Sequence, residues 1–145
     1  MSVLEDFLTA NEEEAVVEAI RKAEQKTSGE IRVHIETSCD TDIMEHAMEV
    51  FHYLKMDNTK DENGVLIYIA IKKRAFVIYG DKGINDKVGI SFWNSTRDTI
   101  AQHFQNGEFS KGLIKGIEKA GEALSKYFPW QHGDMNELDN SVSKG

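Results

Sequence analysis

The chain has 145 residues, with 25 acidic against 17 basic side chains and a formal net charge of -8. A chain of this length is typical of one domain that buries a core without disulfides or a structural metal. The acidic balance argues against a nucleic-acid or anionic-membrane binder, because both partners require an excess of positive charge. The single cysteine, Cys39, excludes an internal disulfide.

The first predicted element is a helix over residues 9–27. Thr9 and Glu12 have the spacing of a capping box, which closes the N-terminal turn of a helix. Apolar residues then recur along one stripe, as in a helix that buries one face. Ser28-Gly29 provides a stop at its C-terminal end.

The next predicted elements are a strand, a second helix and two more strands. Residues 30–37 alternate apolar and polar side chains, which predicts a half-buried strand. A helix capped by Asp40 or Thr41 follows, with apolar positions at the helical period. Residues 65–71 are apolar on both faces, as in a central strand, and residues 74–79 return as its antiparallel partner.

The C-terminal half is predicted to be helical. One helix opens at Asp86 or Ser91 and ends near Gln105, and a second covers residues 109–128 and stops before Pro129. No secretory signal is visible, and the longest apolar run is too short to cross a bilayer. We therefore expect a cytoplasmic protein without membrane insertion.

This order of elements predicts one domain over residues 1–130 and a flexible acidic tail over residues 131–145. The right-handed crossover rule makes the first two strands parallel, which gives an α/β layered domain around a short mixed sheet. The sheet would hold two parallel strands and one antiparallel hairpin strand, with room for one extra short strand.

Four carboxylates are predicted to meet at one edge of this sheet. Parallel strands begin at the same edge, and the antiparallel third strand ends there. This edge collects Glu30, Asp61, Asp81 and Asp86. Clustered like charges repel one another, and hard oxygen ligands without His or Cys suit Ca²⁺ or Mg²⁺. The pattern therefore predicts a divalent-cation site.

A simpler interpretation stays open, because turns are rich in Asp, Asn and Gly for backbone reasons alone. Sharper motifs do not match. An EF-hand loop aligned from Asp57 has Glu62 where glycine is required. Asp40 and Asp42 stand where an aspartate-nucleophile phosphatase has its loop, but a helix N-cap accounts for them more simply. No catalytic residue is assigned.

Several segments together resemble one protein family. They are Leu8-Thr-x-x-Glu12, Thr27-Ser-Gly-Glu-Ile31, Asp61-Glu-Asn-Gly-Val-Leu-Ile67, Tyr79-Gly-Asp-Lys-Gly-Ile84 with Asp86, and Phe109-Ser-Lys-Gly-Leu113. With these segments the chain resembles the TPM domain family, named from a thylakoid acid phosphatase, a photosystem II repair protein and a receptor modulator. The resemblance covers residues 7–129, and the Asp-x-Asn-Gly-Val-Leu step is its most distinctive part.

The resemblance implies a three-layer α/β/α sandwich around a short mixed sheet. It also implies binding of a divalent cation, with calcium favoured, through acidic residues in these loops. Asp61, Asp81 and Asp86 are the candidate metal ligands that the family pattern supports, whereas Glu30 rests mainly on the predicted geometry. An acid phosphatase activity has been attributed to the thylakoid member.

We therefore expect a monomeric, non-enzymatic module that binds Ca²⁺ or Mg²⁺ and regulates an unknown protein partner. A metal-assisted acid phosphatase is the alternative, with Asp81 as general base. A third option is a protein-interaction domain that binds no metal and uses the acidic face of the first helix. No nucleic acid is expected among the partners.

Overall fold

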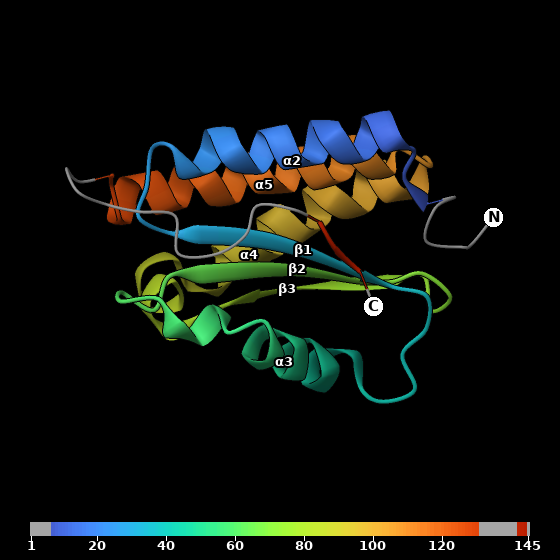
Figure 1. Cartoon of the computed structure of the whole chain (residues 1–145), viewed down its shortest axis with the longest axis horizontal. Coiled ribbons are helices and arrows are strands. Elements are labelled where there is room, and N and C mark those ends of the chain that lie inside the picture. The colour runs from blue at the N-terminus through green and yellow to red at the C-terminus, as the bar shows by residue number, and fades with distance from the viewer. Residues whose placement is uncertain (1–6, 131–141, 145) are drawn as a thin grey trace.

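The computed structural model describes residues 7–130 and 142–144. A four-stranded sheet lies between helices on both of its faces (Figure 1). Of the described helices, three cover one face: α2 (Ala10–Glu24), α4 (Lys82–Gln105) and α5 (Phe109–Tyr127). The other face is covered by α3 (Ile43–Tyr53). The expected three-layer α/β/α sandwich is confirmed.

The strands of the sheet follow the order β3-β2-β1-β4. The first two, β1 (Glu30–Glu36) and β2 (Gly64–Ala70), are parallel, and β3 (Ala75–Gly80) returns antiparallel to β2. In this register Glu30 pairs with Gly64, at the edge where β3 also ends. The start of β1, the start of β2 and the end of β3 therefore share one edge, as predicted.

The first two described helices begin at side-chain caps. Thr9 Oγ1 accepts a hydrogen bond from the Glu12 backbone N–H at 3.1 Å, and Glu12 Oε1 accepts one from the Thr9 N–H at 2.8 Å. This is the predicted capping box. The cap of α3 is Asp42 rather than Asp40 or Thr41, because the Asp42 carboxylate accepts a hydrogen bond from the first turn at 3.1 Å.

The predicted start of α4 is wrong. We expected it at Asp86 or Ser91, but Asp81 caps the helix and Lys82 is its first residue. The helix is broken at Gly89, whose φ of 75° and ψ of 172° are not helical. A second helical segment restarts after this break, which is why the sequence near Ser91 has the signals of a helix start.

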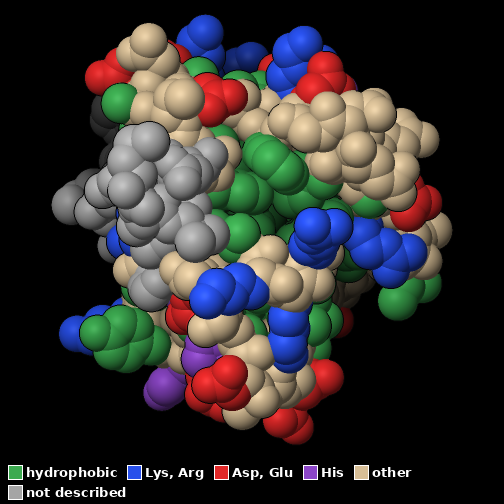
Figure 2. All heavy atoms as spheres, turned by 90° about the vertical axis from the view of Figure 1, so that its right-hand side faces the viewer, with side chains coloured by type: hydrophobic (Ala, Val, Ile, Leu, Met, Phe, Trp, Pro, Cys, Tyr) green, Lys and Arg blue, Asp and Glu red, His purple; other side chains and the backbone are tan. Residues whose placement is uncertain are grey.

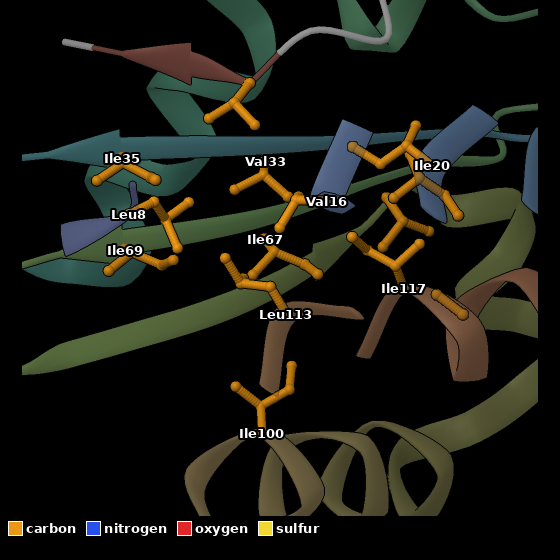
Figure 3. Close-up of a cluster of buried hydrophobic side chains, with 14 of the residues drawn as sticks. Leu8, Val16, Ile20, Val33, Ile35, Ile67, Ile69, Ile100, Leu113 and Ile117 are labelled. Atoms are coloured by element: carbon orange, nitrogen blue, oxygen red, sulfur yellow. The ribbon is translucent and has the colours of Figure 1, made fainter. Parts of the chain in front are cut away.

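The larger hydrophobic core lies between the sheet and the layer formed by α2, α4 and α5 (Figure 3). Ile20 of α2, Ile67 of β2 and Ile117 of α5 belong to it, and each is at most 1% exposed. A smaller core under α3 includes Phe51 and Leu66. Because both layers cover β2, this central strand is buried over its whole length. Among the described helices, none combines the length and apolar character that a membrane crossing requires.

Residues 142–144 extend the sheet beside β1. The short strand β4 (Ser143–Lys144) runs parallel to β1, and Val142 is buried in the larger core. Lys144 Nζ also forms an ion pair with Glu13 Oε1 of α2 at 2.5 Å. The predicted flexible tail covers residues 131–145, of which 131–141 and 145 lie outside the described residues. The part that is described forms the extra short strand of the sheet.

Candidate functional site

The loops before β2 and after β3 lie against each other at the predicted edge. The Ile84 backbone N–H donates a hydrogen bond to the Glu62 carbonyl oxygen at 3.3 Å. Gly83 allows this approach, since a Cβ at its position would stand 2.6 Å from the same oxygen. The segments that carry Asp61 and Asp81 therefore meet at one edge of the sheet.

The four candidate ligand side chains differ in burial. Asp61 and Asp86 are exposed, Asp81 is half-buried and Glu30 is buried. In the part of the chain that the structure describes, no three His, Cys, Asp or Glu side chains are grouped so that they could hold a metal ion. The edge thus brings the backbones of the two loops into contact, but the described carboxylates do not form a cage around one point.

Glu30 forms a buried pair with Glu24 at the C-terminal end of α2. Glu24 Oε2 accepts a hydrogen bond from the Ile31 N–H at 2.8 Å, and the Glu24 carboxyl is hydrogen-bonded to Glu30. Burial and the Glu30 charge raise the pKa of Glu24 to about 9. Glu24 therefore holds a proton at neutral pH, which reduces the repulsion between the two carboxyls. The sequence analysis did not anticipate this pair.

The two carboxylate oxygens of Asp81 have different surroundings. Oδ1 accepts a hydrogen bond from the Lys82 N–H at 2.8 Å, at the N-terminus of α4. Oδ2 is buried and has no hydrogen-bond donor among residues 7–130 and 142–144. A buried carboxylate oxygen without a donor is unfavourable, so a cation at this atom would stabilise the site.

Asn63 provides a second oxygen of this kind, in the loop before β2. The side chain is 1% exposed, and its Nδ2 donates a hydrogen bond to Ser28 Oγ at 3.2 Å. Its Oδ1 is buried without a donor among the described residues. The sequence analysis missed Asn63 as an oxygen ligand, although this residue belongs to the Asp-x-Asn-Gly step on which the resemblance rests.

A further carboxylate, Asp57, acts on the same tyrosine as Asp81. Asp57 is part of a short 3-10 turn, η1 (Met56–Asn58), and its Oδ2 is 2.6 Å from His52 Nδ1. Burial, together with the negative charges of Asp81 and Asp57, raises the pKa of Tyr79. Burial is the largest cause of this shift, and the two carboxylates add to it.

Sequence comparison identifies the family of this chain. The sequence model of the TPM domain matches residues 2–123, which is most of the chain. The chain belongs to the TPM domain family. The matched range contains all four candidate ligands as well as Asn63 and Glu24.

Three solved structures resemble this TPM domain. The BA42 protein from the psychrophilic bacterium Bizionia argentinensis, solved by NMR, is 60% identical, with a TM-score of 0.92 and 100% of both chains covered. The N-terminal domain of a P. gingivalis protein is 19% identical, with a TM-score of 0.71, over 87% of this chain and 83% of that one. The N-terminal domain of the cg2496 protein from Corynebacterium glutamicum is 13% identical, with a TM-score of 0.65, over 90% and 84% of the two chains. The last two show the common fold alone. No curated relative matches the chain.

Proposed function

We propose that this TPM domain is a divalent-cation-binding module whose site is the acidic edge formed by residues 61–63 and 81–86. The observation that carries the proposal is the pair of buried oxygens, Asn63 Oδ1 and Asp81 Oδ2, that have no donor in the described part of the chain. They belong to two segments that the hydrogen bond between Ile84 and Glu62 holds together. Such oxygens lower their free energy by coordinating a hard cation.

The available donors suit Ca²⁺ better than Mg²⁺. Carboxylate, amide and backbone carbonyl oxygens are the ligands that Ca²⁺ takes, in flexible geometry, whereas Mg²⁺ demands a nearly ideal octahedron. Asp81 and Asn63 would supply the fixed, buried oxygens. Asp61 and Asp86 are exposed, so their side chains have the freedom to turn toward a cation from the solvent side. Glu30 would contribute negative charge through its pair with Glu24.

The role that fits such a site is regulatory and non-enzymatic. A cation that binds only the folded chain stabilises it by mass action, by about 2.7 kcal/mol at a hundredfold excess over Kd. Binding would also neutralise part of the negative potential at the edge. The surface offered to a protein partner would therefore change with the concentration of free cation.

Thermal unfolding of the chelator-treated chain tests the proposal. We expect millimolar Ca²⁺ to raise the Tm, and Mg²⁺ to raise it less. The double variant Asp61→Asn with Asp81→Asn keeps the shape of both side chains and should lose most of this rise. Asp98→Asn on α4 is the matched control, because Asp98 is an exposed aspartate outside the edge. A Tm that does not respond to either cation, or responds equally in the double variant, would refute the site.

A further inference from the structure

A second candidate site lies at the opposite end of the sheet from the acidic loops. A cavity of about 740 Å³ opens between the end of β2, the start of β3, the C-terminal end of α4 and the start of α5. Figure 2 shows this end of the molecule, where hydrophobic side chains line a hollow with Lys and Arg side chains below it and acidic side chains above it. A mostly apolar cavity of this size with few polar groups is typical of a small-molecule site.

The wall of the cavity is built from four phenylalanine rings, Phe7, Phe76, Phe104 and Phe109. The rings contact one another, with centroids 4.5 Å apart for Phe7 and Phe109 and 5.1 Å apart for Phe76 and Phe104. This packing holds the wall in place before any ligand arrives. Each ring is nevertheless only partly buried, so apolar surface stays open to the cavity.

The mouth of the cavity carries positive charge in a chain that is acidic overall. Arg74 lines the cavity and follows Lys72 and Lys73 in the turn between β2 and β3. No acidic side chain of the described residues lines the cavity with them. Arg74 also has a φ of 51°, a left-handed conformation that is unfavourable for a residue other than glycine. Backbone strain of this kind concentrates at binding sites.

The charge of the chain favours a small ligand over a membrane surface as the partner of this cavity. Lys73 Nζ donates a hydrogen bond to the Thr41 carbonyl oxygen at 2.7 Å, and of the three basic residues in this turn Arg74 is the one that lines the cavity. A formal net charge of -8 opposes adsorption to an anionic bilayer. A single anionic molecule that enters the cavity avoids this repulsion, because only its head group meets the local positive charge.

We propose that this cavity binds a small anionic amphiphile with one aliphatic chain and a terminal carboxylate. The aliphatic chain lies against the phenylalanine rings, which removes apolar surface from water on both partners. The carboxylate lies at Arg74, whose guanidinium donates two parallel hydrogen bonds to such a group. The site is independent of the cation site, since the two lie at opposite ends of the strands.

Calorimetric titration of the full chain with dodecanoate, below its micelle concentration and with chelator present, tests this proposal. We expect saturable binding, and binding of dodecyltrimethylammonium that is weaker by about tenfold or more. NMR amide shifts caused by dodecanoate should be confined to the turn between β2 and β3 and to the ends of α4 and α5. The chelator keeps the outcome separate from the outcome for the cation site.

Two variants and a control sharpen the test. Arg74→Asn removes the charge but keeps a residue that tolerates a positive φ. This variant should bind dodecanoate about tenfold more weakly, while its affinity for dodecanol, the uncharged analogue, should not change. Ala101→Phe fills the cavity from α4 and should abolish binding of both ligands. Arg97→Asn removes an exposed arginine of α4 outside the cavity and should change neither affinity. An NMR spectrum of each variant establishes that it is folded.

Several outcomes would overturn the proposal. These are no binding of dodecanoate to the wild type, equal affinity for the cationic amphiphile, or binding that survives Ala101→Phe in a folded variant. A concentration-dependent dimer that forms without ligand and is lost in Ala101→Phe would identify a second copy of the chain as the occupant instead.

Discussion

Gly83 and Asp61 are in direct contact: a side chain at Gly83 would overlap the carbonyl oxygen of Asp61. The contact joins the first turn of α4 to the loop before β2. It therefore fixes how closely the two segments of the candidate cation site approach each other. Only glycine fits at this position without moving one of the two backbones.

Gly83→Ala should destabilise the fold by about 1–3 kcal/mol, because the added methyl group forces the two loops apart. Urea unfolding measures the effect as a lower midpoint. Lys82→Ala is the control, since Lys82 is exposed on the same turn of α4 and its truncation should cost no more than about 0.5 kcal/mol. If Gly83→Ala proves as stable as Lys82→Ala, the two loops do not pack as described.

Glu24→Gln should flatten the pH dependence of stability. The pKa of Glu24 is about 9 in the folded chain, against an ordinary value of 4.5. The folded state therefore binds one proton more between these values, so the free energy of unfolding falls as pH rises from 4.5 to about 9. The slope is at most about 1.4 kcal/mol per pH unit. Glutamine keeps an acceptor for the Ile31 N–H and a donor for Glu30, but it does not titrate.

Urea titrations across this pH range measure the difference. Above neutral pH the Glu24→Gln variant should be more stable than the wild type, with the gap widening toward pH 9. Glu14→Gln, which changes an exposed residue of the same helix, should follow the wild type. A Glu24→Gln variant that loses stability with pH as steeply as the wild type would show that Glu24 is ionised in the folded chain.

His34 should make the fold less stable in mild acid. It is buried on β1, with Nε2 2.9 Å from Glu36 Oε1 and Nδ1 2.9 Å from Ser143 Oγ of β4. Burial lowers the pKa of His34 below its ordinary 6.5, although the Glu36 carboxylate opposes the shift. The unfolded chain therefore takes up the proton first as pH falls, and stability is lost from about pH 6.5 down through the folded pKa.

The slope of stability against pH tests this prediction. His34→Gln retains a donor and an acceptor in the same strand but cannot be charged, so its stability should fall less between pH 6.5 and pH 5. His52→Gln, which changes an exposed histidine of α3, serves as the comparison. Equal slopes in the His34→Gln variant and the wild type would mean that His34 is not the group responsible.

The sheet and its acidic edge could be predicted because local patterns determine them. The alternation over residues 30–37 and the apolar run over 65–71 mark two strands, and the short turn after the second leaves only an antiparallel hairpin. The start of α4 was missed for an equally local reason. Gly83 and Gly89 are poor helix formers, and they hide a helix that Asp81 caps directly after β3.

The arrangement of buried polar groups could not be predicted, because it depends on contacts between distant segments. Glu24 follows Val16 and Ile20 at four-residue spacing, which places it on the buried stripe of α2, but only the fold places it beside Glu30. That Asn63 Oδ1 lacks a donor among the described residues likewise follows from what surrounds it in space. The pairing of β4 with β1 joins residues more than a hundred positions apart.

Calorimetric titration of the chelator-treated chain with Ca²⁺ tests the cation site most directly. The wild type and the Asp98→Asn control should each bind one Ca²⁺ with saturable heat, and Asp81→Asn should bind about tenfold or more weakly. No heat of binding to the wild type at millimolar Ca²⁺, or an unchanged Kd in Asp81→Asn, would contradict the account.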